Sequence, residues 1–251
     1  MNCKDELFTN QVSFEDVLND KKNDKYVRRI LSKEARPFLL NIHYARRLPC
    51  ITDAFGLFVN GEMIGVVTYG IPASHPLCIG IAGEKNQYNV KELNRLVILP
   101  KYNGGGYNYA SFLVSHSLKM LAPGTFVVSY ADTAWTHVGY VYQACNFLYT
   151  GLSAKRTDTY QPNGLHPRAY NKDNHSNLQQ TRSRKHRYIY LVGNKRDKKR
   201  MMSELKYPII AKYPKGNERK YNTDNPTPTE PIQIISKEKK TDDDKRSISL
   251  S

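Results

Sequence analysis

Alternating and continuous apolar runs along the middle of the chain predict a series of β-strands. The first two runs, Phe55–Val59 and Met63–Tyr69, flank Asn60-Gly61, a dipeptide typical of tight hairpin turns. Three further runs rich in β-branched and aromatic residues predict strands: VKELNRLVIL from Val90, TFVVSYAD from Thr125 and KHRYIYLVG from Lys185. TFVVSYAD is apolar over most of its length, which indicates burial on both faces of a sheet.

Helical spacing alternates with these strands. A helix after Pro37 would place Phe38, Ile42 and Ala45 on one face, and a helix over Ala110–Leu121 follows the glycines Gly104–Gly106. HVGYVYQACNFLYTGL predicts a short helix and then a strand, and RDKKRMMSEL predicts a short basic helix. The first 34 residues are polar with weak helical spacing, and the composition after residue 222 is that of a disordered tail.

The order of these elements predicts an α/β (α+β) fold. We expect an N-terminal extension over residues 1–34, a main domain over residues 35–222 and a disordered tail over residues 223–251. Within the main domain, residues from about 151 to 222 differ from the rest, because they are basic and poor in aliphatic side chains.

Positive charge is concentrated in that basic part. The chain carries a net charge of +15, and residues 151–222 hold 18 lysines and arginines against 5 aspartates and glutamates. A basic segment gains free energy on a polyanion by releasing counterions, so we favour nucleic acid as the partner over a merely solvated basic surface. The predicted phosphate contacts are Arg182, Arg184, Lys185, Arg187, Lys195 and Arg196.

Composition disfavours a membrane or secreted protein. No apolar run approaches the ~20 residues that a membrane helix needs, and the opening MNCKDELFTNQ does not have the pattern of a signal peptide. The four cysteines, Cys3, Cys50, Cys78 and Cys145, are far apart and form no CxxC pair. We therefore expect buried free thiols and a cytosolic setting.

The run from Glu92 to Leu121 joins a strand to a helix through three glycines. Free backbone N–H groups at the start of a helix attract an anion, and Lys101 stands beside the turn. Glycines also let a backbone approach a phosphate closely. The turn is neither a Walker A sequence nor GxGxxG, so on spacing alone a phosphate-binding loop and a plain surface turn fit equally well.

Two stretches resemble the GNAT N-acetyltransferase family. LNRLVILPKYNGGGYNYASFLVSHSL is similar to that family's acyl-CoA pyrophosphate motif, and VYQACNFLYTG is similar to its C-terminal motif. The resemblance implies a mixed central sheet flanked by helices. It also implies an acyl-CoA donor held near Lys101, Gly104, Gly105 and Gly106, although Tyr102-Asn103 stand where the family usually has Gln or Arg.

A narrower resemblance is to the phage Mom-type DNA modification proteins. HYARRLP, VTYGIP, ELNRL, SYADT and HVGYVYQACNFLYTG occur in that family's order between His43 and Gly151. The resemblance implies a GNAT-like fold and an enzyme that converts adenine in DNA to N6-(carbamoylmethyl)adenine, which shields phage DNA from restriction. It further implies double-stranded DNA as the partner and the host cytoplasm as the location of a phage-encoded protein.

The functional residues implied by the Mom-type resemblance fall, by position, on Tyr44, Tyr69, Arg95, Ser111, Asp132 and Tyr142. We assign Ser111 to the donor site and the other five to the catalytic site, and we add His43 because its ordinary pKa suits neutral pH. The adenine amino group is a poor nucleophile, so a base must take its proton. Asp132, at the end of a buried strand, and His43 are the candidate bases.

The remaining roles stay open between function and structure. Tyr142 would protonate a leaving thiolate or stack on the base, and Arg95 would hold a carboxylate, a phosphate or Asp132 itself. Buried Arg–Asp pairs and packed tyrosines are also common structural features. Because the target atom lies inside a stacked duplex, we expect the base to be everted, with Tyr44, Tyr69 and Trp135 as stacking partners.

Donor and metal are less determined by the sequence. The donor is acyl-CoA or a glycine-derived unit, including one carried on RNA. Iron is associated with the Mom type, and His43, Asp132 and His137 are the residues that could meet around it, but no HExxH or paired Cys/His spacing marks a metal site. The competing functions are an ordinary GNAT acyltransferase for a protein or small-molecule amine and a non-catalytic nucleic-acid-binding protein.

Overall fold

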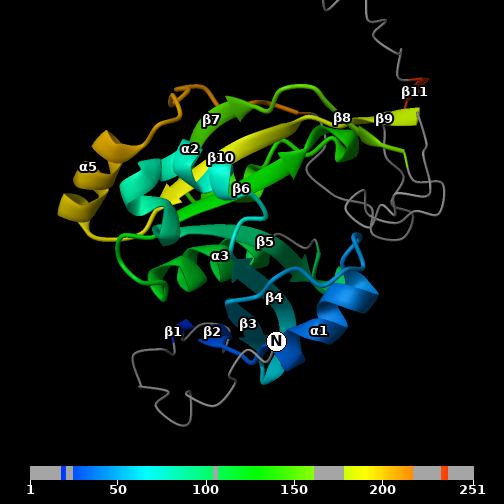
Figure 1. Ribbon diagram of the computed structural model, residues 1–251. Coiled ribbons are helices and arrows are strands. Elements are labelled where there is room, and N and C mark those ends of the chain that lie inside the picture. The colour runs from blue at the N-terminus through cyan, green and yellow to red at the C-terminus, as the bar shows by residue number, and fades with distance from the viewer. Residues whose placement is uncertain (1–17, 21–24, 104–106, 161–177, 217–232, 237–251) are drawn as a thin grey trace, which may run out of the picture.

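The computed structural model describes residues 18–20, 25–103, 107–160, 178–216 and 233–236. Its centre is an eight-stranded sheet in the order β1-β2-β3-β4-β5-β6-β10-β7 (Figure 1). These strands are β1 (Leu18–Asp20), β2 (Lys25–Arg29), β3 (Asp53–Val59), β4 (Glu62–Gly70), β5 (Val90–Ile98), β6 (Phe126–Asp132), β10 (Lys185–Leu191) and β7 (Leu148–Leu152). Strands β5 and β6 run parallel, and the other described neighbours run antiparallel.

Helices cover both faces of this sheet, so the predicted fold class, a mixed sheet flanked by helices, is confirmed. On one face α3 (Tyr109–Lys119) packs Leu113 and Leu118 into the largest buried cluster, and α4 (Tyr140–Ala144) lies beside it. The opposite face carries α1 (Ser32–Pro37), the π-helical turn η2 (Phe38–Ile42), α2 (His75–Asn86) and α5 (Lys195–Glu204). None of the described helices is long and apolar enough to cross a lipid bilayer.

The predicted hairpin and buried strands are present. Asn60 and Gly61 join β3 to β4 with φ angles of 50° and 80°, the left-handed values that a tight hairpin turn requires. In β6 the four consecutive residues Phe126–Ser129 are buried, as its continuous apolar run predicted. Three short 3-10 turns complete the body: η3 (Gln87–Asn89), η4 (Pro100–Tyr102) and η5 (Thr133–Trp135).

A second, smaller sheet extends from the end of the central one. It has the order β11-β9-β8 and consists of β8 (Arg156–Thr159), β9 (Leu178–Arg182) and β11 (Ile234–Ser236). In Figure 1 it projects at the right, beyond the ends of β7 and β10. We call the β8–β9 pair the polar ribbon, because its residues are RTDT and LQQTR.

Strands β5 and β6 separate soon after they begin. Their parallel pairing covers only Val90–Glu92 against Phe126–Val128. At the next residue the carbonyl of Leu93 accepts a hydrogen bond from the Ser129 hydroxyl, at 3.1 Å, instead of a backbone N–H. A bulge at Asn94 then shifts the register of β5 against β4, and the Asn94 amide group is held by Thr68 and by the carbonyl of Cys50. The two strands therefore diverge like the sides of a wedge.

Several expectations differ from the structure. Residues 25–29, placed in the N-terminal extension, form β2 of the central sheet, where Val27 is buried; the helical spacing near Phe14 lies outside the described residues. The helix expected after Pro37 begins at Ser32 and ends at Ile42, with Pro37 inside it. Helix α2 was not predicted, because its sequence contains two glycines. In the tail, Ile234–Ser236 forms β11, and the rest lies outside the described residues.

Candidate active site

A pocket of about 330 Å³ lies where β5 and β6 diverge. Its walls come from Glu92–Leu96 of β5 and Tyr130–Asp132 of β6, and Lys185 of β10 lies beside Asp132. His43 and Tyr44, which follow the π-helical turn, and residues 136–142 complete the lining. We call this cavity the wedge pocket. It brings together five of the six residues predicted to be catalytic: His43, Tyr44, Arg95, Asp132 and Tyr142.

The carboxylate of Asp132 is already engaged on both oxygens. One oxygen accepts a hydrogen bond from the Ala134 N–H at 3.0 Å and so caps the η5 turn. The other forms an ion pair with the Lys185 ammonium at 3.0 Å, from the residue directly opposite on β10. Asp132 therefore orients the pocket rim and balances the charge of Lys185.

His43 is neutral at physiological pH. Burial, aided by the positive charge of Arg95, lowers its pKa to about 4. Its Nδ1 accepts a hydrogen bond from the Ala45 N–H at 3.0 Å, so the proton of the neutral ring sits on Nε2. Its ring stacks on the Tyr44 ring, with 4.3 Å between the ring centroids, and the Tyr44 ring lies against the Trp135 ring, with 5.3 Å between centroids. His43 is thus arranged as a hydrogen-bond donor within an aromatic rim.

The guanidinium of Arg95 is partly buried and only partly satisfied. Its Nη1 donates to the carbonyl of Asn94 at 2.6 Å, while Nε has no partner among the described residues. Burial lowers its pKa, and the nearby Tyr44 and Glu92 oppose that effect. Within the described residues Arg95 forms no ion pair with Asp132, so its remaining N–H groups are available to a bound anion or carbonyl.

Glu92 was missed by sequence reasoning. It lies in the ELNR motif that pointed to Arg95, but a glutamate early in a strand gives no signal of burial. In the structure it lines the wedge pocket, and burial raises its pKa against the opposing charges of Arg95 and Lys185. Among the described residues no hydrogen bond or ion pair holds its carboxylate. A partly buried, unpaired carboxyl group with a raised pKa has the properties of a general base or acid.

Tyr142 closes the pocket from α4. Burial raises its pKa to about 12, and its hydroxyl shares a hydrogen bond with the Ser129 hydroxyl, which itself bonds the Leu93 carbonyl. At neutral pH the phenol therefore keeps its proton and can donate it. Gly139, the N-cap of α4, has a φ of 77° and lies against the Tyr142 and Tyr188 rings, which fixes the start of this helix.

Tyr69 is not brought into the wedge pocket. It is fully buried in the core, its hydroxyl lies 2.6 Å from the Ser117 Oγ, and its ring packs edge-on against Phe55. Burial raises its pKa. The position of Tyr69 in β4 supports the helix α3 that carries Ser117, and its ring cannot stack on a base in the pocket.

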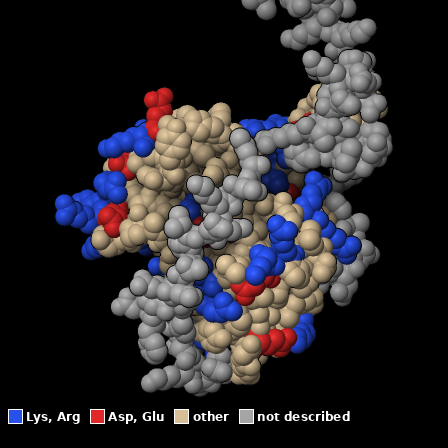
Figure 2. Space-filling view, turned by 60° about the horizontal axis from the view of Figure 1, so that its bottom comes forward, with Lys and Arg blue, Asp and Glu red and all other residues tan. Residues whose placement is uncertain are grey.

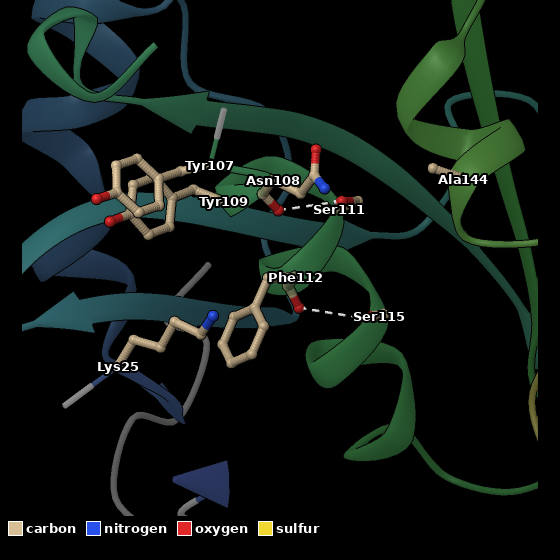
Figure 3. A pocket seen from close by; sticks show the side chains of 8 residues that line it. All are labelled: Lys25, Tyr107, Asn108, Tyr109, Ser111, Phe112, Ser115 and Ala144. Atoms are coloured by element: carbon tan, nitrogen blue, oxygen red, sulfur yellow. Dashed lines mark hydrogen bonds between the residues drawn. The ribbon is translucent and has the colours of Figure 1, made fainter. Parts of the chain in front are cut away.

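A second hollow, of about 380 Å³, opens at the start of α3 (Figure 3). Tyr107 and Tyr109 lie face to face on one side of it, and the Lys25 ammonium reaches over the Phe112 ring from the other. Ser111, the residue assigned to the donor site from the resemblance, lines this hollow. Asn108, the N-cap, makes no side-chain cap, so it leaves the first N–H groups of the helix unoccupied by its own side chain.

The other predicted donor residues are placed differently. Lys101 is paired with Glu62 at 2.8 Å and lies outside the lining of the hollow. Gly104, Gly105 and Gly106 lie outside the described residues. Helix α4 connects the two cavities, because Ala144 lines the hollow at α3 while Tyr140–Tyr142 line the wedge pocket.

The residues considered for iron do not form a ligand set. No group of three or more His, Cys, Asp or Glu side chains in the described part of the chain could hold a metal ion. The Nδ1 of His43 is used by Ala45, and both oxygens of Asp132 are used by Ala134 and Lys185. His137 lines the same pocket, where burial lowers its pKa.

The predicted phosphate contacts separate into two groups. Arg182, Arg184 and Lys185 lie at the root of the polar ribbon, whereas Lys195 and Arg196 begin α5 at the other end of β10. Arg187 is half-buried and already engaged within the protein, over the Tyr207 ring at 3.3 Å and in hydrogen bonds to Thr150. Figure 2 shows lysines and arginines in several separate groups, one of them at the left edge, the side on which α5 lies in Figure 1.

Comparison with known proteins gives the family. A sequence profile of the Mom protein family matches residues 24–215, a span that includes both cavities and the polar ribbon. The chain belongs to the Mom protein family. No curated protein sequence matches it.

Several solved structures with a similar fold are acetyltransferases. The ribosomal-protein-S18-alanine N-acetyltransferase of Escherichia coli has 12% identity and a TM-score of 0.39, over 68% of this chain and 95% of that one. An N-acetyltransferase from Staphylococcus aureus has 15% identity and a TM-score of 0.41, over 67% and 99%. The spermidine N-acetyltransferase of Vibrio cholerae has 14% identity and a TM-score of 0.40, over 66% and 93%. Similarity at this level carries no argument about substrate.

Proposed function

We propose that this protein is a transferase that adds a carbamoylmethyl group to N6 of adenine in phage DNA and so protects that DNA from host restriction enzymes. The observation that carries the proposal is the match to the Mom protein family over the residues that build the wedge pocket. The pocket offers groups suited to this chemistry: an aromatic rim, a partly buried carboxyl group, a neutral histidine and a phenol that keeps its proton.

The size of the pocket favours a single everted base as the acceptor. About 330 Å³ is at the lower end of the range for small-molecule sites and cannot admit a base pair within its duplex. A target atom inside a duplex is reached only when the nucleotide turns out of the stack. Tyr44 and Trp135 stand at the rim, where an everted purine would stack on an aromatic face.

The polar groups of the pocket then have distinct roles. As the bond between N6 and the methylene carbon of the donated group forms, Glu92 takes the N6 proton, and the bond from that methylene carbon to the leaving atom of the donor breaks. The leaving atom keeps the electron pair and receives a proton from Tyr142. Arg95 and the Nε2–H of His43 bind the carbonyl oxygen of the transferred group and so hold its methylene carbon in line with N6. Asp132 holds Lys185 and the η5 turn in place.

The donor would enter from the hollow at the start of α3. Lys25 and the first N–H groups of this helix form a positive environment suited to a phosphate-bearing carrier, which fits CoA and also RNA. For a carbamoylmethyl product, the leaving atom of that carrier is bonded to the methylene carbon of the donated group. Helix α4 leads from this hollow to the wedge pocket, so a reactive group carried on a long arm would arrive beside Tyr142.

The test is the nucleoside content of DNA from cells that express the protein. We expect plasmid DNA from a bacterium expressing the wild type to contain a new modified deoxyadenosine, which Asp132→Asn and Arg95→Ala eliminate. Arg28→Ala, at an arginine paired with Glu34 outside both cavities, should leave the yield within about twofold of wild type, since a change far from the site is usually near neutral.

Mass alone does not identify the product. A carbamoylmethyl group and a glycyl group contain the same atoms, with the methylene and carbonyl groups exchanged. The nucleoside must therefore be compared with synthetic N6-(carbamoylmethyl)deoxyadenosine by retention time and fragmentation. Identity with this standard supports the proposal, whereas an N6-glycyl product would mean plain acyl transfer. Unmodified DNA from a folded protein in its phage host would overturn the proposal in favour of another amine acceptor or of simple nucleic-acid binding.

A further inference from the structure

The polar ribbon lacks the usual reason for a small β-sheet to be stable. None of its described side chains belongs to a buried cluster, although β11 adds a third strand beside β9, and a small sheet without an apolar face is marginal in water. Opposed residues share a face, so one face carries Arg156, Asp158, Gln180 and Arg182 and the other carries Thr157, Thr159, Gln179 and Thr181. Both faces present groups that bind phosphate or base edges rather than a protein core.

Two arginines stand directly opposite each other in this ribbon. Arg156 and Arg182 are cross-strand partners, an arrangement that places like charges side by side and weakens the pairing. Asp158 compensates for one of them, through a 3.0 Å ion pair with Arg182. Arg156 is exposed and makes no hydrogen bond or ion pair among the described residues. The two arginines therefore leave a net positive charge that an external anion would relieve.

The root of the ribbon is joined to the rim of the wedge pocket. The carbonyl of Arg184 accepts hydrogen bonds from the N–H and hydroxyl of Thr133, at 3.0 and 2.9 Å, in the η5 turn that carries Trp135. The Arg184 Nε donates to the carbonyl of Ser153, which closes the base of the ribbon. Burial raises the pKa of Tyr130, a lining residue, and the charge of Arg156 opposes this shift, so the ribbon lies within electrostatic reach of the pocket.

The basic residues of α5 are placed elsewhere. Strand β10 runs from Lys185, beside Asp132, to Leu191, and α5 follows it. Seven residues of strand span about 20 Å, so the exposed Lys195 and Arg196 lie at the far end of the sheet from the pocket. Of the two basic groups, only the ribbon adjoins the cavity in which we place the everted base.

We propose that the polar ribbon is the duplex-holding element of this protein, with Arg156 and Arg182 on backbone phosphates beside the everted base. This inference rests on the proposed function for the choice of duplex DNA as the polyanion. It adds Arg156, which the charge pattern did not single out, and it removes Lys195 and Arg196 from the surface that holds the substrate.

Binding of a fluorescent adenine-containing duplex, followed by anisotropy in the absence of any donor, tests the proposal with the full chain. We expect R156A/R182A to raise the dissociation constant at least tenfold at about 0.1 M salt. The plot of the logarithm of the association constant against the logarithm of the salt concentration should also become less steep, by about two in slope, because two phosphate contacts are lost. K195A/R196A removes the same charge from α5 and should change the affinity less than threefold. R156K/R182K retains the charge and should keep most of the affinity.

The outcomes separate this inference from the proposed function. Equal weakening by the ribbon and α5 variants would mean a diffuse charge effect and overturn the inference, as would unchanged binding by R156A/R182A. A loss confined to a single-stranded or structured RNA probe would assign the ribbon to an RNA and also overturn it. Failure of the wild type to bind any duplex would count against DNA as the substrate itself. Arg156→Ala alone breaks no described contact, so this variant should fold and should bind the duplex more weakly than wild type, even if the double variant unfolds.

Discussion

The ionisable side chains of the wedge pocket differ in how many of their polar atoms already have a hydrogen-bond or ion-pair partner within the protein. Asp132 has both oxygens engaged, and His43 has one ring nitrogen engaged and a pKa lowered to about 4. Glu92 has no described partner, and burial raises its pKa. Proton removal from a weak nucleophile needs an unengaged base, so residue by residue the pocket favours Glu92 as the base and leaves orientation to the other two.

The buried His43 should make the protein sensitive to acid. Its ordinary pKa is 6.5 and its folded pKa about 4, so between these values the unfolded chain binds a proton that the folded chain does not. Stability is therefore lost as pH falls through this window, by up to about 3 kcal/mol from this group. His43→Asn retains an acceptor for the Ala45 N–H and does not titrate. Denaturant unfolding at pH 7 and pH 4.5 should show a smaller loss for His43→Asn than for wild type; equal losses would contradict the shift.

Glu92→Gln should separate stability from activity. A carboxyl group with a raised folded pKa stabilises the fold only while protonated, and that contribution is lost as pH rises through the folded pKa. At neutral pH the substitution removes a partly buried charge, so we expect a higher melting temperature together with loss of the modified nucleoside.

Asp132→Asn provides the contrast for that variant. It leaves Lys185 without its ion-pair partner, so we expect a lower melting temperature than wild type. Both measurements use thermal unfolding at pH 7 and the plasmid nucleoside assay. Full activity of a folded Glu92→Gln protein would exclude Glu92 as the base.

At the scale of elements, the position of α4 depends on the glycine that begins it. Gly139 has a φ of 77°, and a Cβ there would lie 2.5 Å from the Tyr188 ring and 3.0 Å from the Tyr142 ring. Gly61 has a φ of 80° in the β3–β4 turn, with nothing within 4 Å of an added Cβ. The two glycines share a backbone conformation and differ in the space around them.

Alanine substitutions at these glycines should therefore differ in cost. Gly61→Ala should lose about 1 kcal/mol for the left-handed backbone alone, and Gly139→Ala should lose a further 1–3 kcal/mol for overpacking, roughly. Chemical denaturation measures both, and equal losses would show that the Tyr188 ring moves aside without penalty. Because Tyr142 lies in the first turn of α4, three residues after Gly139, Gly139→Ala should also reduce the yield of modified nucleoside while Gly61→Ala preserves it.

Several of the elements follow from the sequence, while the wedge does not. The β3–β4 hairpin, β5, β6, β10 and the helices α3 and α5 were predicted because each has a local signal in turn residues or apolar spacing. The divergence of β5 from β6 depends on the Ser129–Leu93 hydrogen bond and the Asn94 bulge, which are contacts between distant segments. The core position of Tyr69 could not be predicted, because a motif position does not show which way a strand side chain points.

At the scale of the whole molecule, the net charge of +15 does not show that the basic residues lie on two separate surfaces, the polar ribbon and α5. The sequence placed the basic residues in one segment, but β10 carries that segment across the sheet and separates the ribbon from α5. Several of the cations are also paired internally, Arg187 over Tyr207 and Lys185 with Asp132. A count of charges along a chain therefore overstates the surface that one polyanion can touch.

The place of β10 in the sheet has a consequence for protein synthesis. Strand β10 is the last of the central strands to be translated, yet it lies between β6 and β7, and in the described structure β7 pairs only with β10. A growing chain that has reached residue 152 holds β7 without a partner. Strand β7 joins the sheet only when residues 185–191 have left the ribosome and β10 can pair with both β6 and β7. Since Lys185 of the same strand pairs with Asp132, the wedge pocket is completed at that moment, and nascent chains arrested earlier should be inactive and prone to aggregate.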